Sequence, residues 1–160
     1  MSKDQKKELR VQLLHALRGD QSHIDFASAI GDLPAELGGV KAEFAPHTAW
    51  QLLEHMRIAQ HDLLEFSRNP KHKSPKWPEG YWPKTDAPAN KKAWEKSIAT
   101  FKKEAQEMED LISDPKRDLF APVEGGTGQT LLREALVAAA HHSYHLGQLV
   151  FLKKMLLKKG

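Results

Sequence analysis

The chain has 160 residues, of which 40% are hydrophobic and 28% charged, with a formal net charge of +3 and no cysteine. This length suits one folding unit, so we expect a single domain over residues 1–160. No apolar run approaches the roughly 20 residues that a membrane helix needs, and the lack of cysteine excludes thiolate nucleophiles and cysteine-ligated zinc. Lysines alternate with glutamates instead of forming a basic stripe. We therefore expect a cytoplasmic protein with no nucleic-acid or membrane partner.

Four long helical patterns follow one another along the chain, and no period-2 strand is predicted. The first begins near Ser2, a suitable N-cap, and is broken by Gly19. Asp20 is predicted to cap a short helical continuation, after which residues 31–46 form an irregular connection. The apolar positions of these two segments are Leu9, Leu13, Leu17, Ile24, Ala27 and Ile30.

The second long helix is predicted to begin between Pro46 and Thr48 and to end at Asn69. Residues 68–89 then form a long loop that holds five of the nine prolines. The loop also carries three aromatic residues, Trp77, Tyr81 and Trp82. This composition favours an ordered segment, which either lines a functional pocket or covers one end of the core.

The third helix is predicted from Asn90 to Asp114, and the fourth from Gln129 to Leu157. The second, third and fourth helices each carry an apolar stripe at the spacing of a bundle helix. These stripes are Leu52, Met56, Ala59, Leu63 and Phe66; Trp94, Ile98, Phe101, Ala105, Met108 and Ile112; and Leu131, Ala135, Ala138, Leu149, Leu152 and Leu156. The pattern predicts an all-α fold, an antiparallel four-helix bundle with a long Pro- and Trp-rich loop between helices two and three.

A histidine cluster lies in the middle of the last helix. His141 and His145 are four residues apart and share one helical face, which is the start of a metal site. His142 and His145 are three apart and face the core about equally well, so periodicity leaves both pairs open. Two buried imidazoles one turn apart are costly without a partner, and a tight site needs a third ligand.

The third ligand must come from one of six other histidines: His15, His23, His47, His55, His61 and His72. His55 borders the apolar stripe of the second helix near its middle, at the same depth as the cluster on the fourth helix. Two imidazoles from one helix and one from a partner leave coordination positions open for water or substrate, as at a catalytic metal. The alternative is that His55 is a hydrogen-bonded core histidine.

The segment WQLLEH at residues 50–55, followed by HHSYHLGQ at residues 141–148, resembles the DinB-like superfamily, which includes the YfiT-type metal-dependent hydrolases. The resemblance spans roughly residues 5–155. It implies a four-helix bundle that holds one divalent metal through His55, His141 and His145, and so favours His141 over His142. It also implies a homodimer and relatives that are hydrolases, thiol-dependent transferases or stress-response proteins.

The resemblance names no substrate. We expect either a hydrolase or a transferase of a low-molecular-weight thiol acting on a small molecule, with nickel or zinc as the metal and manganese or iron as alternatives. The competing hypothesis is a non-catalytic metal-binding or stress-response bundle that acts through protein interaction. No catalytic acid or base is identified, because Glu54 and Tyr144 point about 100° away from the neighbouring ligands. Gln148 is either a hydrogen-bond partner of a ligand or a packing residue.

Overall fold

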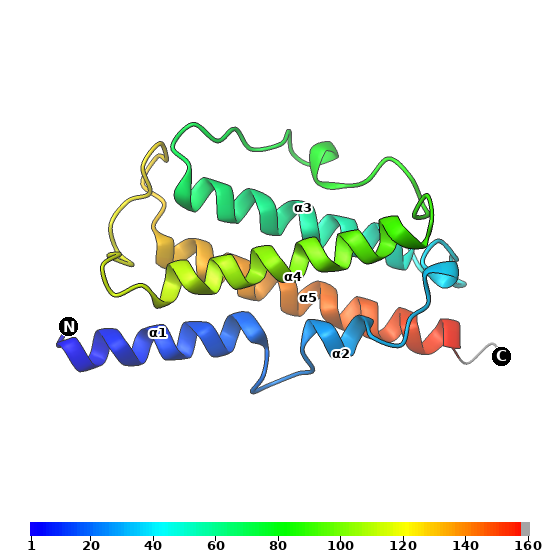
Figure 1. The fold of residues 1–160 in the computed structure, drawn as a ribbon, viewed down its shortest axis with the longest axis horizontal. Helices are drawn as coiled ribbons and strands as arrows, with labels where there is room; N and C mark the ends of the chain where they lie inside the picture. Colours follow the sequence, from blue (N-terminus) through cyan, green and yellow to red (C-terminus); the bar gives the residue numbers. More distant parts are fainter. Residues whose placement is uncertain (158–160) are drawn as a thin grey trace.

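The computed structural model describes residues 1–157, which fold into five α-helices joined by loops. Four of these helices are long and lie alongside one another (Figure 1): α1 (Lys3–Arg18), α3 (Ala49–Arg68), α4 (Lys91–Ser113) and α5 (Leu131–Leu157). The short helix α2 (Phe26–Ile30) and two 3-10 turns, η1 (Ala35–Leu37) and η2 (Glu79–Tyr81), lie in the connections. No β-strand occurs within residues 1–157, so the predicted all-α bundle is confirmed.

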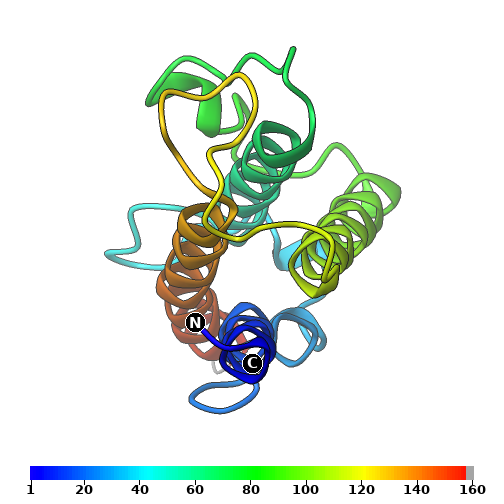
Figure 2. The same cartoon turned by 90° about the vertical axis from the view of Figure 1, so that its left-hand side faces the viewer.

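The long helices run two in each direction. Helices α1 and α5 run one way along the bundle, while α3 and α4 run the other way (Figure 1). Seen along the bundle in Figure 2, the order around the axis is α3, α4, α1 and α5. The pairs α3/α5 and α1/α4 are therefore antiparallel neighbours, whereas α3 and α4 are parallel neighbours. The long loop makes this possible, because it carries the chain from the end of α3 back to the end at which α3 began (Figure 1).

The helix boundaries follow from capping groups in the sequence. Ser2 and Thr48 each form a capping box, with Gln5 and Gln51 respectively, and the Asn90 side chain accepts the Ala93 N–H. Helix α1 ends at Gly19, whose φ of 70° is the left-handed conformation that glycine adopts readily.

The predicted cap of the short helix was wrong. Asp25 caps α2 by accepting the Ser28 N–H, because it immediately precedes the helix and its carboxylate reaches the first turn. Asp20, predicted for this role, instead accepts a hydrogen bond from His15 at the end of α1. The cap of the helical continuation therefore lies five residues later than predicted.

The core has two parts. The larger packs α2, α3, α4 and α5 around fully buried side chains such as Leu53, Met56 and Leu149. The smaller joins α1 to the start of α5 through Leu13 and Leu131. No helix in the described part of the chain is both long enough and apolar enough to cross a membrane.

The loop between α3 and α4 is tied to α3 along its length. His72 Nε2 and the Tyr81 hydroxyl both donate to Asp62, at 2.7 and 2.5 Å. Near the start of α3, the Thr48 hydroxyl donates to the carbonyl of Asp86 at 2.6 Å. Contacts at both ends hold the loop against the helix, so the residues between them have fixed positions above α3.

Candidate metal centre

Three imidazoles from two helices converge between α3 and α5. Helix α3 supplies His55, and α5 supplies His141 and His145 one turn apart. The Nε2 atom of His55 lies 3.1 Å from Nε2 of His145 and 2.9 Å from Nε2 of His141. One nitrogen from each residue lies within 4.8 Å of the other two, and His55 and His145 are buried. The structure thus brings together the three histidines that the sequence singled out.

In two of these rings the remote nitrogen, Nδ1, points away from the cluster, and its hydrogen bond defines which nitrogen carries the proton. His55 Nδ1 donates to the backbone carbonyl of Tyr81 at 2.8 Å, and His145 Nδ1 donates to Gln148 Oε1 at 2.9 Å. A neutral imidazole with its proton on Nδ1 has a lone pair on Nε2. Two lone pairs therefore face each other across 3.1 Å between His55 and His145, which is a contact that only a shared cation makes favourable.

All three imidazoles are kept neutral by their surroundings. Burial and the neighbouring imidazoles lower the pKa of His141 to about 3. Burial also lowers the pKa of His55 and His145, although their Nδ1 hydrogen bonds to Tyr81 and Gln148 act in the opposite direction. Neutral imidazole is the form that binds metal ions, so the cluster is ready to accept a cation at neutral pH.

The spacing of the three nitrogens fits a divalent metal ion. Bonds of about 2.05 Å from imidazole nitrogens to a tetrahedral metal place the nitrogens about 3.3 Å apart. The distances of 2.9 and 3.1 Å in the cluster are close to that value. Unlike the Nδ1 atoms of His55 and His145, Nδ1 of His141 is buried without a hydrogen-bond partner among residues 1–157. The three residues can hold a divalent ion and leave at least one coordination position to another ligand.

The long loop completes one wall of the cluster. The Trp82 ring stacks on His55 with a centroid distance of 4.0 Å and an interplanar angle of 3°. The His47 ring also stacks on the Trp82 ring, with a centroid distance of 4.1 Å. Of the three loop aromatics, Trp82 and the backbone of Tyr81 therefore reach the site, whereas the Trp77 side chain is exposed. The sequence left open whether this loop lines the pocket, and it gave no signal for the stacked His47.

The remaining histidines make contacts of other kinds. His142 is buried on a different face of α5, edge-on to Phe101 with ring centroids 5.0 Å apart. Four others bind polar groups: His15 binds Asp20, His23 binds Ser143, His61 binds Glu104 and His72 binds Asp62. None of these five residues joins the cluster.

Three polar residues lie close to the ligands in sequence. Glu54 and Tyr144 point away from the cluster, and Gln148 contacts it. Glu54 pairs with Arg57 and accepts a hydrogen bond from Ser97 on α4, so its carboxylate links α3 to α4. Tyr144 is largely exposed. Gln148 binds His145 directly, so of the two roles that the sequence left open it has that of a hydrogen-bond partner.

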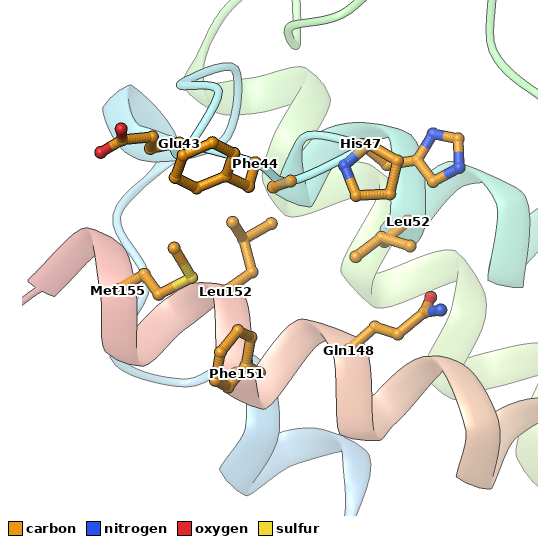
Figure 3. A pocket seen from close by; sticks show the side chains of 10 residues that line it. Glu43, Phe44, His47, Leu52, Gln148, Phe151, Leu152 and Met155 are labelled. Atoms are coloured by element: carbon orange, nitrogen blue, oxygen red, sulfur yellow. The ribbon is translucent and has the colours of Figure 1, made fainter.

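An apolar pocket of about 330 Å³ lies next to the cluster. Gln148 and His47, which contact His145 and Trp82, form its inner end, and Leu52, Leu152 and Met155 line its walls (Figure 3). The Phe44 ring lies across this space from Phe151 and Met155 (Figure 3). Nearly the whole surface of the pocket is apolar, with Glu43 as the single acidic residue that lines it within residues 1–157.

The fold and the histidine cluster together define a helical bundle with a candidate three-histidine metal centre. Residues 19–149 match the sequence model of the DinB superfamily. Since this match covers most of the chain, the protein belongs to the DinB superfamily, and the predicted resemblance is confirmed. Nothing among curated proteins and nothing among solved structures matches the chain.

Proposed function

We propose that this protein is a metal-dependent enzyme acting on a small molecule, either as a hydrolase or as a transferase of a low-molecular-weight thiol. The observation that carries the proposal is the pair of Nε2 lone pairs of His55 and His145, which face each other at 3.1 Å in a buried site. Arranging them in this way costs free energy unless a cation lies between them. Nickel and zinc are the proposed metals, with manganese and iron as alternatives.

Three neutral imidazoles leave the full charge of a divalent ion in place, so the ion would act as a Lewis acid toward a water, a thiol or a carbonyl group. Around it, the Tyr81 carbonyl and the Gln148 amide fix the orientation of two ligand rings. Trp82 covers one face of His55 and excludes water from that side. Because the chain has no cysteine, a thiol reaction would need a thiol co-substrate.

The test measures metal content in protein purified without a histidine tag, by inductively coupled plasma mass spectrometry. Wild type is compared with His55→Ala and His145→Ala. The matched control is His61→Ala, which changes an exposed histidine on α3 that binds Glu104 outside the cluster. Circular dichroism of every variant reports whether the helical fold survives.

We expect about one metal ion per chain in wild type and in His61→Ala, and none in the two cluster variants. A chain that takes up no nickel or zinc even after incubation with either ion would contradict the proposal and leave a non-catalytic, stress-response or interaction protein. If metal binds, a screen of hydrolase and thiol-transfer substrates follows. Sedimentation analysis of the same samples tests the homodimer that the family resemblance implies.

A further inference from the structure

We propose that the apolar pocket beside the histidine cluster binds an uncharged, apolar portion of the substrate, about 10 Å long, while a polar group of the same molecule reaches the metal. This inference rests on the proposed function, since it names the substrate class of that same site. The substrate is then amphiphilic: a metal-binding head followed by an aliphatic or aromatic tail.

The pocket lies beside the cluster, and Gln148, which accepts a hydrogen bond from His145, is one of the residues that line it. On α5, Gln148 follows the ligand His145 by three residues, Leu152 by seven and Met155 by ten. At 1.5 Å per residue, the pocket extends from about 5 to about 15 Å beyond the ligand along the helix axis. On α3, Leu52 precedes His55 by three residues and lines the same space. A molecule bound at the cluster therefore has an apolar pocket about one helical turn away.

The lining of the pocket is chemically suited to an apolar ligand. The walls consist of Ala45, Pro46, Leu52, Phe151, Leu152 and Met155. At the inner end, Gln148 Oε1 accepts a hydrogen bond from His145, and the His47 ring stacks on Trp82. Glu43, the one charged residue of the lining within residues 1–157, is exposed, so a charged tail deeper in the pocket would lose hydration without gaining an ion-pair partner, whereas an apolar tail gains free energy for each methylene that it buries.

Phe44 lies at the mouth of the pocket in an unusual backbone conformation. Its φ is 62°, and it is the one non-glycine residue with a positive φ within residues 1–157. A bulky side chain rarely adopts this conformation, and here the conformation leaves the side chain 95% exposed. The ring is almost fully exposed, so packing within the chain does not account for that placement. The ring instead lies over the pocket opposite Phe151 (Figure 3), where it can close on an apolar ligand.

The experiment uses n-alkyl hydroxamates, from acetohydroxamate to octanohydroxamate, as probes of metal-loaded protein. The hydroxamate head binds the metal and is the same throughout the series, so the dependence of affinity on chain length reports the pocket alone. We expect the affinity to rise about fourfold per methylene until the pocket is full. This factor is the transfer free energy of one buried methylene expressed as a ratio of affinities. The ¹³C-methyl signal of Met155 should shift with the longer chains, while that of the fully buried Met108 stays in place.

Variants with a matched control separate the pocket from general effects on the surface. Phe151→Asp places a charge on the rim of the pocket and should abolish the chain-length dependence while acetohydroxamate binds as before. Phe120→Asp makes the same change at another exposed phenylalanine, between α4 and α5, and should leave the series unchanged. Phe44→Gly should weaken octanohydroxamate binding at least tenfold but leave the melting temperature equal or higher, because glycine relieves the positive φ.

Each result has one meaning. Metal uptake with an affinity that is independent of chain length overturns the pocket inference and leaves the proposed function intact. A chain that binds no metal defeats the proposed function. In that case the alcohols from butanol to octanol test the pocket by itself, because their binding can be followed by the Met155 methyl signal in metal-free protein. A Met155 shift that depends on protein concentration, with no ligand binding, assigns the pocket to a second copy of the chain and overturns the inference.

Discussion

Two faces of α5 carry buried histidines that are adjacent in sequence, and the surroundings of these faces differ. On one face, His141 and His145 direct Nε2 toward His55, and His145 is held by Gln148. On the other, His142 packs against Phe101, and its Nε2 has no partner in the described chain. Burial lowers the pKa on both faces. Burial and a lowered pKa are therefore no sign of a site. The informative features are the convergence of the three Nε2 atoms and the hydrogen bonds that His55 and His145 make through Nδ1.

Acid gives the largest expected effect, and a substitution of His142 isolates the part that comes from the face outside the cluster. Burial lowers the pKa of His142 to about 4 from an ordinary value of 6.5, so between these pH values the unfolded chain binds a proton that the folded chain does not. Stability contributed by neutral His142 is therefore complete above pH 6.5 and is lost as the pH falls toward 4. The full loss is about 3 kcal/mol.

Urea denaturation in the presence of a chelator, at pH 7 and at pH 4.5, measures this loss. His142→Leu should lose about 2.5 kcal/mol less than wild type between the two pH values. Its affinity for metal at pH 7 should match that of wild type, since residue 142 lies outside the cluster. An equal loss of stability in both proteins would mean that His142 is accessible to protons in the folded state.

The second effect concerns the loop, which supports only the face that carries the cluster. Tyr81→Phe removes one of the two hydrogen bonds that Asp62 accepts from the loop and leaves a buried carboxylate with a single donor. We expect the free energy of unfolding to fall by about 1.5 kcal/mol. The matched control, Tyr144→Phe, changes a largely exposed tyrosine and should have no measurable effect in the same denaturation experiment. Equal effects of both substitutions would show that the loop is not held through Asp62.

The orientation of a single ligand gives a third and similar effect. Gln148→Leu removes the acceptor of His145 Nδ1–H while preserving the size of the side chain. We expect about tenfold weaker zinc binding by isothermal titration, as is usual when the outer partner of a ligand is lost. Gln106→Leu, at an exposed glutamine of α4 that binds Asp110, is the control. Unchanged zinc affinity in Gln148→Leu would mean that packing alone orients His145.

The smallest effect lies on the outer face of α5. Gly147 is helical, and a Cβ atom there would meet no atom of residues 1–157 within 4 Å. Gly147→Ala should therefore stabilise the helix by roughly 0.5–1 kcal/mol without changing metal affinity. Thermal denaturation checks this value. Destabilisation would indicate that this third face of α5 packs against something other than the described chain.

The helices themselves could be predicted from the sequence because their signals are local. Ser2 and Asn90 cap the helices that they were expected to cap, and Thr48 caps α3 at the end of the range predicted for its start, since a capping side chain reaches only the first turn. The wrong cap, Asp20, shows the limit of this reasoning. Two aspartates compete in a short connection, and only the chain geometry after Gly19 decides that Asp25 caps the helix.

The parts of the site that sequence reasoning left open depend on contacts between distant segments. Helical spacing did not decide between His141 and His142, because both lie within a wide inward face of α5. The roles of Trp82 and of the Tyr81 carbonyl could not be derived, since no local pattern specifies which residue of a 22-residue loop will lie over His55. The proton position on each ring likewise requires knowing the partner of the remote nitrogen.

The separation of the ligands along the chain has a consequence for biosynthesis. His55 lies 90 residues before His145, and the whole of α4 and the long loop are made between them. At 5–20 residues per second, a ribosome needs about 5 to 20 s to synthesise the interval. Throughout that time the first imidazole has no partner, so an ion that requires all three nitrogens cannot be retained by the growing chain. Capture of such an ion would therefore mark the moment at which α5 has docked and translation of the bundle is nearly complete.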